Sequence, residues 1–245
     1  MAILNTYEFL QTVEDQGKTY IVFARHGESE ANVLRKVAGS SPSADLNLTE
    51  KGKEQAEKLG KALAPFEGRI RIAYTSPLQR AHQTAMIALR AMGCSGRTQL
   101  QVDERIKEKF FGEKVDGQSE EVYNQFAAVE KAETQRMNFS QKWTYTVVKD
   151  AESYEKIYAR VKMFMLEAAA KHPGEIILAF GHKVSSIKIP SMGALAENDI
   201  EVDYRDPPFN NPKNGSTAVF EVDVNRQKIH LVAIDGFSFS FPTVR

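Results

Sequence analysis

The sequence has few of the features that would indicate a secreted, membrane or nucleic-acid-binding protein. Cys94 is the only cysteine among 245 residues, so the chain has no internal disulfide and no multi-cysteine metal site, which favours a reducing compartment. Its 32 basic side chains are balanced by 32 acidic ones. A net charge of zero is unlike the basic balance of a nucleic-acid binder, although it still allows a locally cationic pocket.

Long apolar runs are also missing. No uninterrupted run approaches the roughly 20 residues that a membrane-spanning helix needs. Residues 1–18 lack the basic start and the apolar stretch of a secretory signal. We therefore expect a cytoplasmic protein that acts neither at a membrane nor on a nucleic acid.

Two runs have the pattern of strands that are buried on both faces. Residues 20–24 and 176–180 are continuously apolar, which is typical of a parallel sheet covered by helices. Four further segments have weaker strand patterns, over residues 69–76, 98–102, 216–224 and 228–234. The last two are expected to pair across a turn near Asn225.

Three helical patterns lie between the strands, over residues 48–64, 76–93 and 152–171. Thr49 is expected to cap the first helix, because its hydroxyl can accept from a free backbone N–H. In the second, Ser76 is expected to be the cap, Pro77 the first helical residue and Gly93 the end. Strands that alternate with helices of this length predict a three-layer α/β/α sandwich with a mostly parallel central sheet.

Residues 103–150 interrupt this alternation. The stretch is charged and rich in aromatic residues, among them Phe110, Phe111, Tyr123, Phe126, Phe139 and Trp143. It predicts a helix over about 119–137. We interpret it as a partly helical insertion lying over one edge of the sheet, within a single domain of residues 1–245.

Both strong strands are followed by a histidine, His26 in "FARHG" and His182 in "AFGHK". Open parallel sheets bind ligands at the carboxyl ends of their strands, so two histidines at equivalent ends indicate a shared site. Each alone has a simpler explanation as a hydrogen-bonded residue at a strand end. Arg80 lies in the first turns of a predicted helix, where backbone N–H groups and a guanidinium both suit phosphate. Taken alone, it would be an ordinary surface charge.

The segment "RHGESEAN" resembles the opening motif of the histidine phosphatase superfamily, also called the phosphoglycerate-mutase-like family. Further blocks follow in the family's order: "LNLTEKG" at 46–52, "TSPLQRAHQTA" at 75–85, "ERIKEKFFGEKVDG" at 104–117, "ESYEKIYARV" at 152–161 and "ILAFGH" at 177–182. The resemblance covers most of residues 20–220. It implies that the insertion of about residues 103–150 lies over the active-site edge.

The resemblance implies five catalytic residues: His26 as nucleophile, Arg25, Arg80 and His182 as phosphate-binding groups, and Glu108 as proton donor. Glu104 and Glu113 are neighbouring alternatives for the acid. Two fixed guanidiniums would offset the charge of a phosphoryl group, each by about 4 kcal/mol at 4 Å in a medium with an effective dielectric constant near 20. The same cations should lower the pKa of His26 and keep it neutral. This chemistry requires no metal and no cofactor.

Four further residues fall on positions that bind phosphate or substrate in relatives: Asn32, Gly39, Ser40 and Lys183. Asn32 has a simpler reading as a helix cap, and Gly39 with Ser40 as an ordinary turn. Lys183 departs from the family, which commonly has glycine after the second histidine. Its ammonium either recognises a second acidic group of the substrate or narrows the pocket.

Three functions compete. The resemblance favours a metal-independent phosphomonoesterase that forms a phosphohistidine on His26. The alternatives are a cofactor-dependent phosphoglycerate mutase and a non-catalytic protein that binds phosphorylated ligands. Mutases of the family typically have tryptophan where Ser40 stands, and an arginine pair and a proline-rich stretch in the insertion, both of which residues 103–150 lack. We expect a small phosphorylated substrate or a phosphoprotein. The natural substrate and the oligomeric state stay open.

Overall fold

The computed structural model describes residues 2–3, 5–13, 17–94, 98–198, 200, 212–235 and 239–240. A six-stranded sheet forms its centre, with the strand order β4-β3-β5-β2-β6-β7. The strands are β2 (Thr19–Arg25), β3 (Ile72–Thr75), β4 (Gln99–Val102), β5 (Ile176–Gly181), β6 (Thr217–Asp223) and β7 (Lys228–Ile234). The first four in spatial order are parallel to one another, β6 pairs antiparallel with β2, and β7 pairs antiparallel with β6. The prediction of a mostly parallel sheet is confirmed, as is the C-terminal strand pair.

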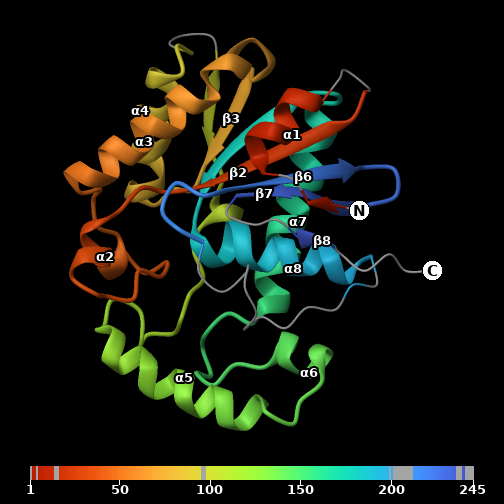
Figure 1. Cartoon of the computed structure of the whole chain (residues 1–245). Helices are drawn as coiled ribbons and strands as arrows, with labels where there is room; N and C mark the ends of the chain where they lie inside the picture. The colour runs from red at the N-terminus through yellow and green to blue at the C-terminus, as the bar shows by residue number, and fades with distance from the viewer. Residues whose placement is uncertain are drawn as a thin grey trace.

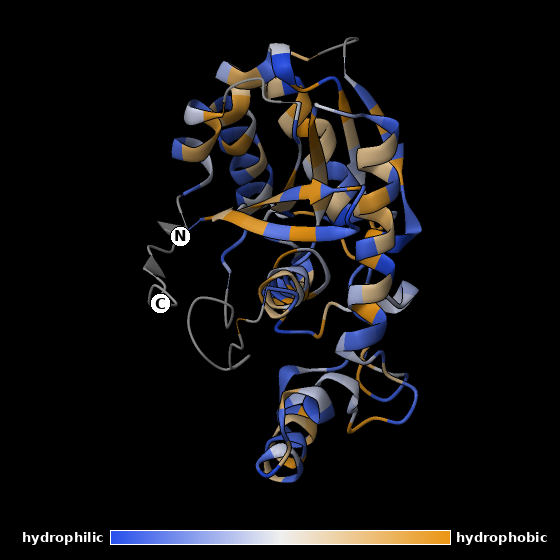
Figure 2. Cartoon of the chain, turned by 90° about the vertical axis from the view of Figure 1, so that its right-hand side faces the viewer, coloured by the Kyte–Doolittle hydropathy of each residue, from blue (hydrophilic) through white to orange (hydrophobic). Residues whose placement is uncertain are grey.

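Helices cover both faces of the sheet (Figure 1). One face carries α1 (Thr6–Thr12), α3 (Glu50–Leu63) and α4 (Gln79–Ala91), and the other carries α7 (Tyr154–Lys171) and α8 (Ile189–Ala196). The side chains of β2 alternate between the two: Ile21 and Phe23 pack in the core under α7 and α8, while Val22 packs with residues of α3 and α4. The three-layer sandwich is therefore confirmed. Figure 2 shows the central strands as largely hydrophobic and the outer helices as mixed.

The start of α4 differs from the prediction. The helix begins at Gln79 with Leu78 as its N-cap, so the assignment of Ser76 as cap and Pro77 as first helical residue was wrong. The backbone N–H of Ser76 still belongs to the sheet, where it donates to Phe180 O at 2.9 Å, and its hydroxyl contacts a histidine of the site. The other helix signals hold: Thr49 Oγ1 accepts from Gly52 N.

The predicted insertion contains α5 (Glu120–Thr134) and α6 (Phe139–Thr144). Both project from one end of the body in the two views (Figures 1 and 2). Backbone hydrogen bonds from Val37 N to Gln118 O and from Glu120 N to Arg35 O, each 2.8 Å long, connect it to the segment after α2 (Glu30–Val33). Among the described residues, no helix has both the length and the apolar composition for crossing a membrane.

Three short 3₁₀ helices and one π-helix complete the described chain. They are η1 (Pro42–Ala44), η2 (Ala64–Arg69), η3 (Glu104–Ile106) and the π-helix η4 (Lys183–Lys188), and the two-residue strands β1 (Ala2–Ile3) and β8 (Phe239–Ser240) pair with each other. The π-helix starts directly after β5 and His182. The π-helix is an uncommon geometry that is often found at functional sites. The end of β5 is therefore a candidate position for a functional site.

Candidate active site

The two histidines lie side by side because their strands are parallel neighbours. Arg25 at the end of β2 is in register with Gly181 at the end of β5, and His26 N donates to Gly181 O at 3.0 Å. The ring centroids of His26 and His182 are 5.3 Å apart. Both rings are buried, with exposed fractions of 3% and 0%. The strand ends thus bring together the pair that the sequence placed at equivalent positions.

His26 has its tautomer set by the backbone. Its Nδ1 lies 2.6 Å from Gly27 O, and because a carbonyl oxygen only accepts, Nδ1 must carry the proton. Nε2 then keeps its lone pair. Burial lowers the pKa of His26 well below its ordinary value, and the cations of Arg80 and Arg25 lower it further. His26 is therefore a neutral imidazole with an available nucleophilic nitrogen.

His182 contacts the serine that sequence reasoning assigned to a helix cap. Its Nε2 lies 2.8 Å from Ser76 Oγ. Its Nδ1 is buried and has no hydrogen-bond partner in the described part of the chain. Burial, followed by the charge of Arg80, lowers the pKa of His182 well below its ordinary value. The ring is therefore neutral, and one of its nitrogens has hydrogen-bonding capacity that the described residues leave unused.

Arg80 is completely buried and is held by main-chain carbonyls. Its Nη2 donates to Ala38 O at 3.0 Å and to Gly39 O at 2.9 Å, and its Nη1 donates to Ala44 O at 3.2 Å. Asp45 Oδ1 lies 3.6 Å from Nη1. Burial lowers the pKa of Arg80, although nearby carboxylates, Glu108 first, oppose this effect.

Arg25 is anchored in the same way. Its Nη1 donates to Pro212 O, and burial lowers its pKa to about 10, so it remains a cation near neutral pH. The Nε atoms of both Arg25 and Arg80 are buried and, within the described residues, lack hydrogen-bond partners. Leaving buried donors unpaired costs about 1–3 kcal/mol each, and more when they are charged. An anion placed between these groups and His182 would relieve that cost.

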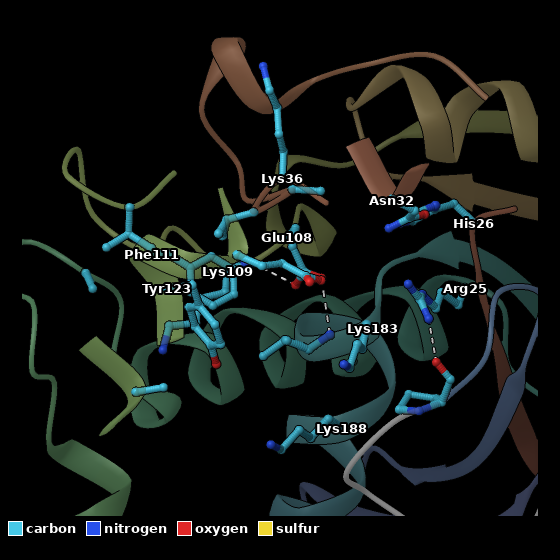
Figure 3. A pocket seen from close by; sticks show the side chains of 18 of the residues that line it. Arg25, His26, Asn32, Lys36, Glu108, Lys109, Phe111, Tyr123, Lys183 and Lys188 are labelled. Carbon is cyan, nitrogen blue, oxygen red and sulfur yellow. Dashed lines mark hydrogen bonds between the residues drawn. The ribbon is translucent and has the colours of Figure 1, made fainter. Parts of the chain in front are cut away.

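Glu108 lines a cavity that Arg25 and His26 also line, whereas the alternative acids Glu104 and Glu113 do not. Its carboxylate is almost fully buried and accepts three backbone hydrogen bonds, from Lys109 N at 2.8 Å, Ser185 N at 3.0 Å and Val184 N at 3.2 Å (Figure 3). Glu104 and Glu113 are exposed and do not line the cavity. The donors at the start of η4 therefore fix one carboxylate beside the histidine pair.

A cavity of about 780 Å³ opens in front of these groups, and the insertion supplies much of its wall. Arg25, His26 and Glu108 line the end of the cavity that holds the histidine, and Phe111 and Tyr123 line the side formed by the insertion (Figure 3). The cavity thus connects the histidine end with the segment that interrupts the predicted alternation of strands and helices.

Several lysines line this cavity, and two of them have a lowered pKa. Lys183 is half-buried, and burial followed by the charge of Arg25 lowers its pKa. Lys109 is only 9% exposed, and its Nζ lies 5.2 Å from the ring centroid of Phe111 and 4.9 Å from that of Tyr154. Burial lowers the pKa of Lys109 as well. The sequence did not predict Lys109 as a cavity residue. It lies in an irregular segment, where no helical or strand periodicity shows which side chains face inward.

The remaining predicted residues lie at different depths. Asn32 lines the cavity, and its Oδ1 accepts from Ser29 N at 3.0 Å and from Asn214 Nδ2 at 3.3 Å. Asn214 also donates to His26 O at 3.0 Å, a contact that the sequence did not predict. Gly39 and Ser40 do not line the cavity. Gly39 instead contributes the carbonyl that holds Arg80.

No group of three or more histidine, cysteine, aspartate or glutamate side chains suited to a metal ion occurs among the described residues. The histidine end of the cavity is instead lined by the guanidinium of Arg25, the imidazole of His26 and the carboxylate of Glu108, whereas Arg80 and His182 are fully buried and are not among its lining residues. This donor set fits an anion better than it fits a divalent cation.

Known proteins are similar to this chain in sequence and in fold. Phosphoglycerate mutase-like protein 4 of Arabidopsis thaliana is 29% identical over 169 residues, which cover 69% of this chain and 68% of that protein. Bacillus stearothermophilus YhfR has a TM-score of 0.68 at 28% identity, over 89% of this chain and 96% of that one. A mutant of the Entamoeba histolytica phosphoserine phosphatase, in complex with phosphoserine, shares the fold with a TM-score of 0.66 at 21% identity, over 89% of this chain and 97% of that one. Shorter matches, over less than half of either protein, are to bacterial 2,3-bisphosphoglycerate-dependent phosphoglycerate mutases.

One family model covers almost the whole described chain. It is the model of the histidine phosphatase superfamily (branch 1), and it matches residues 21–234. That span contains both histidine-bearing strand ends, the helix of Arg80 and the segment of Glu108. The chain belongs to the histidine phosphatase superfamily, branch 1.

Proposed function

We propose that the protein is a phosphomonoesterase that works through a phosphohistidine on His26 without a metal ion. The observation that carries the proposal is the state of His26: its Nδ1 proton is engaged by Gly27 O at 2.6 Å, its pKa is lowered by burial and by two arginines, and its other nitrogen is free to attack. The arginine Nε atoms and His182 Nδ1, which are buried and unpaired in the described structure, are suited to the phosphoryl oxygens.

In the first step, the lone pair of His26 Nε2 attacks phosphorus and forms an N–P bond. The ester P–O bond breaks, its electron pair stays on the leaving oxygen, and that oxygen takes a proton from Glu108. Arg25, Arg80 and His182 stabilise the charge on the transferring oxygens. Asn32, at the cavity wall, and Gly39 with Ser40, in the loop that holds Arg80, support this phosphate end.

In the second step, water attacks phosphorus from the side that the alcohol has left. Glu108, now a carboxylate, accepts the proton of the water, the N–P bond breaks and its electron pair returns to Nε2. Inorganic phosphate leaves, and Glu108 is protonated for the next cycle. Because the guanidiniums supply the positive charge that phosphoryl transfer needs, no step depends on a metal ion.

The cavity favours a small phosphorylated substrate that carries a second acidic group. Its volume of about 780 Å³ suits a metabolite. Lys183 lines it beside Arg25 and is half-buried, so its ammonium is the group that would meet this second anion. A phosphorylated protein side chain would have to enter the same cavity and remains a less suited substrate.

The experiment that tests the proposal measures turnover of para-nitrophenyl phosphate by the wild type and by His26→Ala. We expect the variant to lose at least about 10³-fold in kcat/KM. Rapid acid-free quenching of the wild type should trap phosphate on His26, in an N–P bond that acid hydrolyses. Equal turnover by both proteins would refute the assignment of the nucleophile.

The second candidate is a phosphoglycerate mutase, which the shorter matches to such enzymes favour. A mutase must keep water away from the phosphohistidine, so it would interconvert 2- and 3-phosphoglycerate in the presence of 2,3-bisphosphoglycerate and release little phosphate. Phosphate release that exceeds interconversion supports the phosphatase. The third candidate, a non-catalytic protein, predicts binding of phosphate with no turnover of any phosphomonoester.

A further inference from the structure

Glu108 lies on a segment that has no regular secondary structure to hold it. Residues 107–112, between the 3₁₀ helix η3 and the turn that follows, belong to no helix or strand. The carboxylate can be placed accurately only if the backbone on both sides of it is fixed. The backbone next to His26 and His182 is held by the hydrogen bonds of the sheet. The backbone around Glu108 has to be held by side chains instead.

Arg160 of α7 provides this support on one side. Its guanidinium donates to three carbonyl oxygens at or just before the acid: Nη1 to Arg105 O at 2.6 Å and to Lys107 O at 2.8 Å, and Nη2 to Glu108 O at 3.3 Å. Arginine suits this task because its planar fork presents several donors in a fixed geometry. A lysine at the same position could not reach all three carbonyls.

Glu152 provides the support on the other side. Its Oε2 accepts from Phe110 N at 2.9 Å, and its own backbone N–H donates to Phe110 O, also at 2.9 Å. The same carboxylate pairs with Arg160 in two contacts, Nε to Oε1 at 2.9 Å and Nη2 to Oε2 at 3.0 Å. The pair is mostly buried, with side-chain exposed fractions of 16% and 20%.

We infer that Arg160 and Glu152 are positioning residues for Glu108, which hold its segment against α7 and so direct its proton toward the leaving oxygen. The inference rests on the proposed role of Glu108 as the acid. Neither side chain is among the residues that line the cavity. The charge of Arg160 also contributes to the lowered pKa of His182, and Arg160→Lys keeps that charge while it removes the contacts with the segment of Glu108. A misplacement of about 1 Å can cost about 10²-fold in rate.

The test uses phosphate esters that differ only in the basicity of the leaving phenol. A basic phenolate needs a proton as it leaves, whereas 2,4-dinitrophenolate does not, so loss of the acid harms phenyl phosphate far more than 2,4-dinitrophenyl phosphate. The quantity to compare is kcat/KM, because it covers the steps through the first phosphoryl transfer and ignores slow hydrolysis of the intermediate.

For Glu108→Gln we expect a loss of about 10²-fold or more with phenyl phosphate and of less than about tenfold with the dinitrophenyl ester. For Arg160→Lys and for Glu152→Gln we expect about a tenfold loss with phenyl phosphate and less than about threefold with the dinitrophenyl ester. The double variant Arg160→Lys/Glu108→Gln should lose no more than Glu108→Gln alone, since the two act as one unit.

Glu167→Gln is the matched control. Glu167 also joins α7 to the same segment, through an ion pair with Arg105 Nη1 at 2.7 Å, but it is half-exposed and touches no backbone group next to Glu108. This variant should keep the wild-type ratio of kcat/KM between the two esters.

Equal losses with both esters in Arg160→Lys and Glu152→Gln would overturn the inference while leaving Glu108 as the acid. A Glu108→Gln variant without any dependence on the leaving group would overturn both the inference and the proposed role of Glu108. Should Arg160→Lys fail to fold, Glu152→Gln alone decides, because its amide oxygen keeps an acceptor for Phe110 N while the charge and the acceptor for Arg160 Nε are lost. Additive losses in the double variant would also contradict the inference.

Discussion

Gly39 lies too close to Asp116 to carry a side chain. A Cβ at this position would stand 1.8 Å from Asp116 Oδ1 and 2.4 Å from its Cγ. The carboxylate of Asp116 is buried and accepts from Ser41 N at 2.9 Å and from Phe111 N at 3.1 Å. It thereby joins the loop that holds Arg80 to the segment that carries Glu108. Gly39→Ala therefore tests a contact on which both halves of the site depend.

Two responses to the added methyl group are available, and both cost stability. If Asp116 swings away, two hydrogen bonds to a charged acceptor are lost, each about 1.5–3 kcal/mol before water replaces part of them. If the loop moves instead, the carbonyls of Ala38 and Gly39 leave Arg80. Overpacking of a close-packed interior typically costs about 1–3 kcal/mol. We expect a loss of about 3 kcal/mol in the free energy of unfolding, or about 6–12 °C in Tm for a chain of this size.

The assay is thermal unfolding, with Gly68→Ala as control. Nothing lies within 4 Å of a Cβ at Gly68, which is exposed in η2, so this control should melt within about 2 °C of the wild type. In Asp116→Ala the obstacle is already gone, and adding Gly39→Ala should then cost far less than it does alone. A Tm for Gly39→Ala equal to that of the control, or costs that simply add in the double variant, would refute the steric reasoning.

Three further predictions follow from the charged and hydrogen-bonded groups of the site. Folding lowers the pKa of His26 and His182, so the unfolded chain binds more protons than the folded one below about pH 6.5. Above that pH the free energy of unfolding should not depend on these two histidines, and below that pH it should fall by up to about 1.4 kcal/mol per pH unit for each of them. Denaturant unfolding from pH 7 to 5 should show a shallower fall for His26→Asn than for the wild type. Ser76→Ala removes the partner of His182 Nε2 and should lower kcat/KM about tenfold, whereas an unchanged value would mean that Ser76 is dispensable. Lys183→Met should raise KM about tenfold for phosphoserine and less than about twofold for para-nitrophenyl phosphate, and equal changes would count against recognition of a second anion.

The part of the site built on the sheet could be predicted from the sequence. Strands buried on both faces are apolar without interruption, so β2 and β5 were recognisable, and parallel neighbours bring their carboxyl ends to one edge. The register of Arg25 with Gly181 follows from that arrangement. The histidine pair therefore needed no information beyond the two apolar runs and the residues at which they stop.

The helix-capping rule failed at Ser76, because the backbone N–H and the hydroxyl of this residue are used in tertiary contacts. Ser76 followed by proline has the pattern of a helix start, yet its N–H completes the sheet and its hydroxyl contacts His182. The helix consequently begins two residues later than predicted, at Gln79. Capping preferences describe an isolated helix end, and they could not reveal that a buried imidazole competes for the same oxygen.

The surroundings of Glu108 were beyond prediction for a different reason. In irregular backbone the direction of the side chains does not repeat at a fixed spacing, so nothing in "KEKFFG" shows which side chains face the cavity. The burial of Lys109 between two aromatic rings and the contacts of Arg160 with three carbonyls depend on chain segments about 50 residues apart. Only the resemblance to a family singled out Glu108 from its neighbours.

In the proposed phosphatase reaction, the two ends of the site are supported in different ways, and this difference has a consequence for substrate specificity. The phosphoryl end consists of strand ends and of arginines held by main-chain carbonyls, which have little freedom to move. The leaving-group end consists of Glu108, on an irregular segment that the side chains of Arg160 and Glu152 hold, and of the lysines and the aromatic wall of the insertion. Changes at the strand ends should therefore impair every phosphate ester alike, because all of them present the same phosphoryl group. Changes in residues 103–150 should instead alter which alcohol is accepted, because that segment meets the part of the substrate that differs.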